Sequence, residues 1–424
     1  MGLTLLFGTF FLGLLIGMPV AFALGLAAVC GFWYEGLPLF LAFQRIVSGV
    51  SVYSLLAIPF FIFAGEIMLQ GGIAQRLVRL SAAAVGWMRG GLGVVGVFSS
   101  MLFGGISGSA VADTSALGSI LIPVMKREGY HADYATNVTV ASSIAGVVIP
   151  PSHNMILFAV AAGGVSVSKL FIAGIVPGVL MCLCLAVAAY VIAVRRGYPA
   201  ESFPGFRALA ISFVMALPGL FTAVIIVGGV LSGIMTVTES GAFGAIYALV
   251  VTLRVYRELT WEKFRRAVVA SVRTTAMVMV LVACADAFAY LLALYQVPDL
   301  LAHAVTGISS DPLIILLMLN LTLLVLGMIM DMAPLILICT PIFLPVVTQL
   351  GMDPVQFGVV MMMNLGLGLC TPPVGACLFV GCAVGEIRID QAVRTIWPFY
   401  LAIFVALMLV TYVPAFSMFL PGLL

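Results

Sequence analysis

Charged residues are scarce in this sequence of 424 residues: only 8% are Asp, Glu, Lys or Arg, and only three are histidine. A soluble domain carries about a quarter of its residues as charges, so the composition excludes an ordinary soluble protein. No hydrophilic stretch is long enough for a separate soluble domain. The 18 basic residues are spread along the chain, so the basic cluster expected of a nucleic-acid-binding protein is also missing.

Two further absences concern the N-terminal region and the cysteines. No Lys or Arg precedes Arg45, so the sequence lacks the positively charged leader of a cleavable signal peptide, and residues 2–34 are expected to form retained membrane helix. The eight cysteines lie inside apolar runs, and the spacing of Cys182 and Cys184 is too short for the usual zinc motifs. We expect them to pack as ordinary apolar side chains.

Apolar residues make up 63% of the chain, and they are grouped in runs near the length of about 20 residues that a membrane-spanning helix needs. The runs predict an all-α integral membrane protein. Six lie in the first half and six in the second: 2–16, 19–34, 52–70, 91–125, 134–163 and 168–193, then 209–230, 238–256, 274–294, 312–347, 355–384 and 396–421.

Six runs followed by six indicate a duplication. When the chain is shifted by 222 positions, seven glycines and prolines fall on the same residue type within 59 residues, without a gap. The pairs are Gly105 and Gly327, Pro123 and Pro345, Gly129 and Gly351, Gly146 and Gly368, Pro150-Pro151 and Pro372-Pro373, and Gly163 and Gly385. The chain is therefore predicted to be two copies of one backbone plan.

The charges then predict how the copies are oriented, because basic residues mark cytoplasmic loops. They flank the run 91–125, whereas only acidic residues lie near the ends of the run 312–347. Each copy is expected to have five crossings plus one re-entrant hairpin, and the odd number of crossings inverts the second copy. This count requires two short helices within residues 2–34, broken at residues 17–19. Such inverted repeats are typical of secondary transporters.

The predicted boundaries follow from the runs. The first inverted repeat is residues 1–200, with scaffold helices at 2–70, a hairpin at 91–125, a broken helix at 134–163 and a helix at 168–193. The second is residues 201–424, with scaffold helices at 209–294, a hairpin at 312–347, a broken helix at 355–384 and a helix at 396–421. An amphipathic arm is predicted at 35–50 and another, interfacial in character, at 257–273.

The first motif that could carry chemistry is residues 104–110 (GGISGSA), in the middle of the first hairpin. Three glycines and two serines are expected to break the helix there and to free backbone carbonyls, which lipid cannot satisfy. Carbonyl and hydroxyl oxygens suit a hard monovalent cation such as Na⁺. Close helix packing through small residues explains the motif equally well, so both interpretations stay open.

The second motif is residues 142–154 (SSIAGVVIPPSHN). Its paired prolines remove two N–H donors and unwind the preceding turn, beside Ser142, Ser143 and Asn154. Residues 366–373 (GLGLCTPP) open the same backbone in the second copy. Two symmetry-related breaks facing two hairpin tips favour two ion sites over structural kinks.

Isolated charges at membrane depth are costly and usually functional. Asp331 in the second hairpin and Asp113 in the first could each sense a cation, cap the following half-helix or pair with a basic group. Arg45 could bind a substrate carboxylate or anchor the arm at the interface. Glu239 resembles a helix-start signal. The N-termini of the inner half-helices offer free N–H groups suited to a carboxylate.

At these motifs the sequence resembles the large membrane subunit (M component) of tripartite ATP-independent periplasmic (TRAP) transporters, the DctM/SiaM type, over essentially its whole length. The matching stretches are 56–65 (LAIPFFIFAG), 103–113 (FGGISGSAVAD), 149–152 (IPPS), 256–260 (YRELT), 340–345 (TPIFLP) and 371–375 (TPPVG). Two places depart from the expected pattern: residues 51–54 (SVYS), where a small or Pro-containing segment was expected, and His153.

The resemblance implies an elevator-type fold of the ion-transporter superfamily, driven by a Na⁺ gradient and acting as a secondary transporter rather than an enzyme. It also implies a small four-helix membrane subunit (Q component) and a soluble periplasmic substrate-binding protein (P component), which delivers an organic acid such as a dicarboxylate or a sialic acid. The location implied is the bacterial inner membrane.

The resemblance also implies site residues. The first sodium site would use Ser107, Ser109, Gly146, Ile149 and Pro151, and the second Gly327, Met330, Gly368, Thr371 and Val374. Substrate would be bound by Ser107, Ser152, Asn154, Asp331 and Arg45, while Asp113, Pro150, Pro372 and Pro373 shape the hairpins and breaks.

Two other functions are weighed against this one. The tetrapeptide 105–108 (GISG) matches the short motif of rhomboid-type intramembrane serine proteases, with Ser107 as nucleophile and His153 as base; such an enzyme needs no inverted second copy. A stand-alone Na⁺-coupled carboxylate symporter or channel would need neither the small subunit nor the binding protein.

Overall fold

The computed structural model describes residues 1–200, 202–309 and 311–423, and within these ranges the chain forms helices and no strand. An isolated bridge between Arg89 and Ala200 is the sole extended pairing of the described residues. The predicted boundary between the copies lies at Glu201, outside the described residues, so that boundary stays a prediction.

The helices of the first copy are α1 (Gly2–Leu15), α2 (Val20–Tyr34), α3 (Leu39–Val50), η1 (Tyr53–Leu56), α4 (Ala57–Gln70), α5 (Ile73–Val85), α6 (Gly91–Ser107), α7 (Ala110–Arg127), α8 (Ala132–Ser142), α9 (Ala145–Val148), α10 (His153–Ala161) and α11 (Val167–Arg195). Residues 2–34 do form two short helices, and the turn between them contains Gly17 and Pro19 as predicted.

The helices of the second copy are α12 (Phe206–Leu231), α13 (Val237–Val250), η2 (Val251–Val255), α14 (Trp261–Leu294), α15 (Val297–Ile308), α16 (Pro312–Ile329), α17 (Met332–Gln349), α18 (Pro354–Leu369), α19 (Ala376–Gly385), α20 (Ile389–Thr395), α21 (Trp397–Tyr412), α22 (Ala415–Met418) and η3 (Pro421–Leu423). Thr236 and Glu239 form a capping box at the start of α13, which confirms Glu239 as a helix-start signal.

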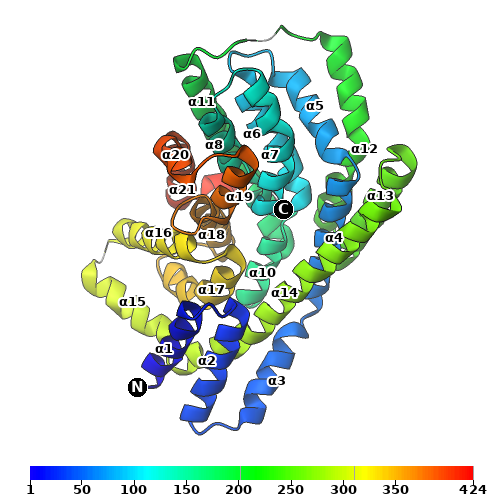
Figure 1. The fold of residues 1–424 in the computed structure, drawn as a ribbon. Helices are drawn as coiled ribbons and strands as arrows, with labels where there is room; N and C mark the ends of the chain where they lie inside the picture. The colour runs from blue at the N-terminus through cyan, green and yellow to red at the C-terminus, as the bar shows by residue number, and fades with distance from the viewer. Residues whose placement is uncertain (201, 310, 424) are drawn as a thin grey trace.

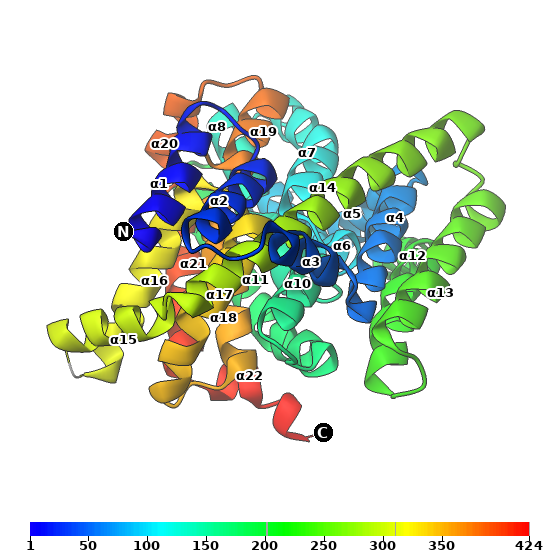
Figure 2. The same ribbon diagram turned by 90° about the horizontal axis from the view of Figure 1, so that it is seen from below.

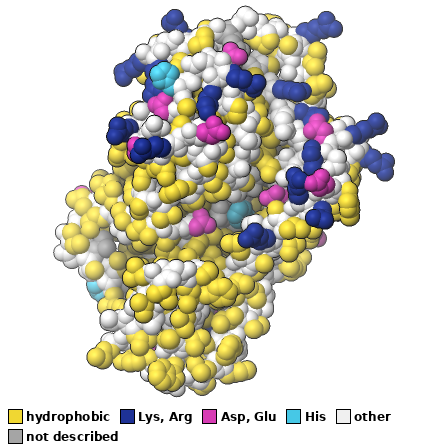
Figure 3. Space-filling view, viewed as in Figure 1, with side chains coloured by type: hydrophobic (Ala, Val, Ile, Leu, Met, Phe, Trp, Pro, Cys, Tyr) yellow, Lys and Arg dark blue, Asp and Glu magenta, His cyan; other side chains and the backbone are white. Residues whose placement is uncertain are grey.

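Long apolar helices dominate the described part of the chain. Six are long and apolar enough to cross a membrane, and two bent helix pairs raise this to eight if each pair is one span. Hydrophobic side chains cover the lower part of the face in Figure 3, whereas Lys and Arg gather over its upper part and right edge. The chain is therefore a multi-pass membrane protein, as its composition predicts.

The duplication is visible in the backbone. The breaks in the two hairpins fall at Gly108–Ser109 and at Met330–Asp331, and α8 and α18 begin 222 residues apart. The Pro150-Pro151 and Pro372-Pro373 peptide bonds are both cis. The fold class is confirmed: an all-α membrane protein in which each repeat carries one hairpin and one broken helix.

The predicted arm at 257–273 is not a separate element. Residues 261–294 form one continuous helix of 34 residues, α14, whereas α3 and α4 in the first copy are separated by residues 51–56. Pro59 explains the difference, because a proline has no N–H for the carbonyl four residues earlier and clashes with it. Its counterpart at the 222-residue offset is Leu281, which leaves α14 unbroken.

Figures 1 and 2 place α4, α12 and α13 on one side of the molecule and α16, α18 and α21 on the other. The helix α14 runs diagonally between the two sides in both views. It packs on α2, α3 and α4, and it also contacts α17. Two shorter helices that the sequence did not predict, α5 and α15, each lead from this scaffold into a hairpin.

Candidate ion and substrate site

The tip of the first hairpin is a tight turn between α6 and α7. Gly108 has a φ of 64°, a left-handed conformation that glycine adopts without penalty. The hydroxyl of Ser109 accepts a hydrogen bond from the Ala112 N–H at 3.4 Å and so caps α7. Ser109, not Asp113, therefore performs the capping that the sequence left open.

Asp113 instead connects the first turn of α7 to the end of α6. Its side chain is fully buried, and its Oδ1 accepts a hydrogen bond from the Ser107 hydroxyl. Its Oδ2 has no hydrogen-bond partner within the described part of the chain. A buried carboxylate oxygen without a partner is costly, so this atom is one that a bound solute could satisfy.

The glycines at the end of α6 perform the close packing that was one of the two roles left open by the sequence. The helix does not break at Gly104 or Gly105 but continues to Ser107. A Cβ added at Gly104 would lie 2.7 Å from the Gly146 nitrogen, and one at Gly105 would lie 3.0 Å from the Pro150 oxygen. Both glycines therefore allow α6 to approach the broken helix backbone to backbone, so the motif combines close packing with a break at Gly108.

The first broken helix opens at the paired prolines. The first part of this broken helix consists of α8 and α9 and ends at Val148. The second part, α10, starts at His153 after a bend of 51°. Pro150 and Pro151 have no N–H to donate to the carbonyls four residues earlier, those of Gly146 and Val147. The predicted unwinding is confirmed.

Two buried polar side chains lie where α10 begins. Ser152 is 0% exposed and Asn154 is 4% exposed, and neither Ser152 Oγ nor Asn154 Oδ1 has a partner among the described residues. A Cβ at Gly108 would lie 3.3 Å from His153 Nδ1 and from the Pro151 oxygen. The start of α10 and the first hairpin tip therefore meet at this point.

The structure brings together the residues predicted for the first sodium site. A Cβ at Gly146 would lie 2.6 Å from Asp113 Oδ2 and 3.4 Å from the Ser109 carbonyl carbon. One at Gly105 would lie 3.4 Å from the Ile149 side chain. Asp113 joins this cluster directly, although the resemblance implied only a structural part for it.

The second hairpin tip meets the second broken helix in a similar way. A Cβ at Gly368 would lie 2.5 Å from the Gly327 carbonyl carbon, and the Val374 N–H donates to the Met328 oxygen at 3.0 Å. The Thr371 hydroxyl donates to the Leu367 oxygen at 2.7 Å. Gly327, Gly368, Thr371 and Val374 therefore share one junction, and Met330 lies in the tip beside it.

The acids of the two hairpins are not equivalent. Asp331 is the exposed N-cap residue of α17 and its side chain makes no capping hydrogen bond. At the 222-residue offset its counterpart is Ser109, not Asp113. The first site thus contains a buried carboxylate, whereas the second has its carboxylate at the exposed tip.

Arg45 belongs to α3, the helix that lies at the lower edge of the molecule in Figure 1. Its guanidinium carbon lies 4.4 Å from the centre of the Tyr290 ring on α14, a cation–π contact. One turn earlier on α14, Asp286 packs closely against Gly49 of α3. A Cβ added at Gly49 would lie 2.7 Å from the Asp286 Cβ. This packing supports the anchoring role of Arg45 that the sequence left open.

Two buried polar contacts that the sequence did not reveal fasten the hairpins to the broken helices. The hydroxyls of Ser100 and Ser142 lie 2.9 Å apart. In the second copy Asn364, the counterpart of Ser142 at the 222-residue offset, donates to Asn320 Oδ1 at 2.8 Å. The residue types differ between the copies, so neither residue identity nor the glycine and proline pattern could identify them.

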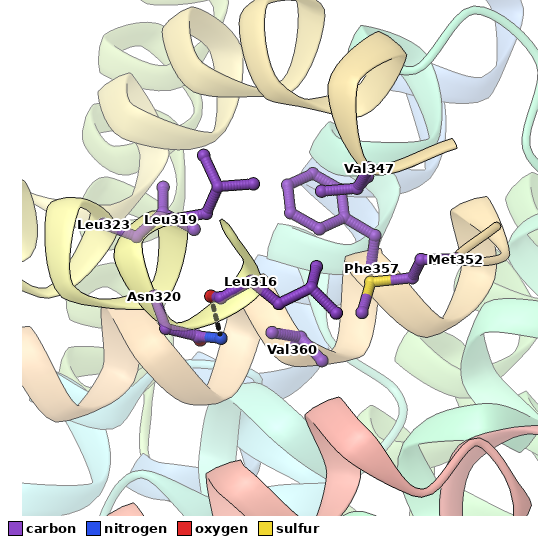
Figure 4. Close-up of a pocket in the computed structure, with 8 residues that line it drawn as sticks. All are labelled: Leu316, Leu319, Asn320, Leu323, Val347, Met352, Phe357 and Val360. Carbon is purple, nitrogen blue, oxygen red and sulfur yellow. Dashed lines mark hydrogen bonds between the residues drawn. The ribbon is translucent and has the colours of Figure 1, made fainter. Parts of the chain in front are cut away.

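The cavity beside Asn320 is too small for a ligand. It lies among α16, α17 and α18 (Figure 4) and has a volume of about 10 Å³, roughly the space of one water molecule. Elsewhere, no group of three His, Cys, Asp or Glu side chains suited to a metal was found among the described residues. A cation at the hairpin tips would rest mainly on carbonyl and hydroxyl oxygens.

Comparison with known proteins decides the family. Residues 7–416 match the model of the tripartite ATP-independent periplasmic transporter, DctM component. The chain belongs to this family. It is therefore a permease subunit of TRAP transporters and not an enzyme, and the serine protease interpretation of the GISG tetrapeptide is wrong.

The relatives of this DctM component are named after different transported compounds. The chain is 38% identical over 403 residues to the 2,3-diketo-L-gulonate TRAP transporter large permease protein YiaN of Escherichia coli, covering 95% of each chain. It is 38% identical over 414 residues to the sialic acid TRAP transporter large permease protein SiaM of Vibrio cholerae, covering 97% of each. The fold resembles the Alcanivorax borkumensis YdaH transporter, with a TM-score of 0.63, 14% identity and 88% of each chain covered.

Proposed function

We propose that this DctM component imports a small organic acid across the bacterial inner membrane, together with Na⁺, by an elevator movement. The observation that carries the proposal is the pair of junctions between hairpin tips and broken helices. At the first junction three buried polar atoms, Asp113 Oδ2, Ser152 Oγ and Asn154 Oδ1, have no partner among the described residues. Unpartnered buried polar atoms are explained when a bound solute supplies the partner.

The residues of the first junction fit Na⁺. Asp113 supplies a buried negative charge, and Ser107 and Ser109 supply hydroxyl oxygens. The prolines leave the carbonyls of Gly146 and Val147 without their helical donors, as in transporter sites where unwound carbonyls hold the ion. Bound Na⁺ would join α6 and α7 to the broken helix and offset the charge of an anionic substrate.

The residues of the second junction fit a second Na⁺ site through backbone oxygens. The glycine pair Gly327 and Gly368 brings the two backbones into contact. Met330 and Val374 would offer backbone carbonyl oxygens. The Thr371 hydroxyl donates its hydrogen to Leu367, so its oxygen lone pairs would remain available to a cation.

The start of α10 suits the carboxylate of the substrate. A helix N-terminus presents free N–H groups and a positive dipole end, and Ser152 and Asn154 add polar side chains there. Asp331 at the exposed second tip would contact hydroxyl or amide groups of the same molecule. Gulonates and sialic acids, the compounds in the names of the two relatives, are organic acids of this kind.

Two partners are part of the proposal: a small four-helix membrane subunit and a soluble periplasmic binding protein. The family description supports a periplasmic component. The mobile body would comprise residues 91–163 and 312–384, and α5 and α15 would link it to the scaffold of α3, α4 and α12–α14.

Reconstituted transport tests the proposal. Proteoliposomes that contain this chain and its small subunit, with binding protein outside, should accumulate the organic acid when an inward Na⁺ gradient is imposed. Replacing Na⁺ with K⁺ should abolish uptake, and equal uptake in K⁺ would refute the coupling. Uptake by this chain alone would identify a stand-alone symporter instead.

A further inference from the structure

A groove with a volume of about 420 Å³ runs between α4 and α14. Its α4 wall is formed by Pro59, Phe60 and Phe63, and its α14 wall by five residues between Val268 and Ala276. Val272 in this wall is 63% exposed, so the groove opens onto the outside of the described molecule.

Further aromatic rings adjoin Phe63 of the groove wall. Phe63 and Phe264 meet edge to face at 6.4 Å, and Phe264 stacks on Trp261 at 5.5 Å. Trp261 is 78% exposed at the start of α14, beside the basic residues that place this end of the helix in the cytoplasm. A tryptophan in this position is typical of the membrane interface, where its ring lies at the level of lipid headgroups.

One cation at the same end has no partner. Arg265 lies one turn after Trp261 and three residues before Val268, so helical spacing puts it on the groove side of α14. It makes no hydrogen bond or ion pair with any described residue, whereas Arg266 pairs with Glu262 and Lys263 donates to the Glu258 oxygen at 3.1 Å. Arg265 is thus free to bind an anion at the mouth of an apolar groove.

The size of the groove indicates what fills it. A helix about 10 Å across displaces roughly 400 Å³ per turn, so the groove could hold only about one turn of a partner helix. A long alkyl chain, by contrast, can lie along its whole length. Basic pockets between helices on the cytoplasmic side are typical sites for anionic lipid headgroups.

We propose that this groove is a binding site for one anionic phospholipid, with an acyl chain between α4 and α14 and its phosphate on Arg265. The ring of Trp261 lies beside the headgroup. The Thr275 hydroxyl, which makes no hydrogen bond with the described residues, is a donor within the groove. The lipid fills the space between the two scaffold helices, independently of the ion and substrate sites.

Native mass spectrometry of the delipidated full-length chain tests this proposal, with palmitoyl-oleoyl phosphatidylglycerol and the matching phosphatidylcholine as probes. Phosphatidylglycerol should bind once and about fivefold more tightly, the factor that about 1 kcal/mol for one basic residue corresponds to. Arg265→Ala should remove this preference, and Ala276→Trp, which fills the groove, should weaken both lipids.

The neighbouring residues provide matched controls. Arg266→Ala removes a cation that is already paired, and Met277→Trp adds the same ring at an exposed position outside the groove; both should bind as the unmodified chain does. Equal binding of the two lipids, or an unchanged preference in Arg265→Ala, would overturn the proposal. Loss of the bound lipid when the small membrane subunit joins would show that a partner helix occupies the groove instead.

Discussion

At the residue scale, the most informative side chain is Asp113. It lies in the first turn of α7, fully buried, with one oxygen bonded to Ser107 and the other directed toward Gly146. The sequence marked it as an acid at membrane depth and left open whether it senses a cation, caps the half-helix or pairs with a basic group. The place of Asp113 at the candidate ion site depends on the turn at Gly108, which brings α7 back against the broken helix. No residue pattern specifies how closely α7 approaches that helix.

Asp113→Asn keeps the size of the side chain and removes its charge. We expect the apparent affinity for Na⁺ to fall about tenfold or more, because a hydrogen-bonded charged group contributes roughly 1.5–3 kcal/mol. Na⁺-dependent uptake in proteoliposomes measures this. Asp390→Asn is the control, since Asp390 is exposed and pairs with Arg388 on the surface; if both variants behave alike, Asp113 is not a ligand.

Glycines give a second prediction at this scale. Gly368→Ala would place a Cβ 2.5 Å from the Gly327 carbonyl carbon, a distance at which the backbones must separate. We expect this variant to lose Na⁺-driven uptake. Gly228→Ala on α12 is the matched control, because nothing lies within 4 Å of the added Cβ. Normal uptake by Gly368→Ala would show that the second junction needs no such close approach.

At the element scale, each hairpin is held to its broken helix by a buried polar contact. The Ser100–Ser142 pair does this in the first copy and the Asn320–Asn364 pair in the second. Asn320 also receives a second bond from Asn364, on its backbone oxygen at 2.9 Å. These contacts fix the register of α16 against α18, on which the geometry of the second junction depends.

Asn364→Ala tests this contact. It removes both of these bonds and leaves the buried Asn320 Oδ1 without a donor, so we expect the free energy of unfolding to fall by about 1–3 kcal/mol. A thermal or denaturant midpoint in detergent measures the loss. Thr322→Ala, on the exposed side of α16, should be nearly neutral because that hydroxyl bonds only within its own helix; equal losses in both variants would contradict the assigned role.

At the scale of the whole molecule, much of the architecture could be predicted because glycine and proline have few substitutes for their backbone roles. The positions of both hairpin breaks and both double-proline breaks follow from the 222-residue offset. The continuity of α14 could not be predicted from the apolar pattern, because the same apolar run can form one long helix or two shorter ones. The missing proline opposite Pro59 is the signal that could have shown it.

The two copies also diverge where the sequence predicted symmetry. Asp113 and Asp331 occupy different positions in their hairpins, and α3 ends where α14 continues. Under the proposed function, the ion site with the buried carboxylate would therefore belong to the first copy alone. This asymmetry would let one junction bind Na⁺ through charge and the other through backbone oxygens.

The most direct test of this account is Na⁺ binding by the purified chain, measured as the shift of its thermal midpoint between NaCl and KCl at equal ionic strength. We predict that Na⁺ raises the midpoint of the unmodified chain. In Asp113→Asn and in Gly368→Ala the shift should become smaller, since each variant loses one of two sites. Identical midpoints in NaCl and KCl for the unmodified chain would contradict the claim that the broken helices and hairpin tips hold Na⁺.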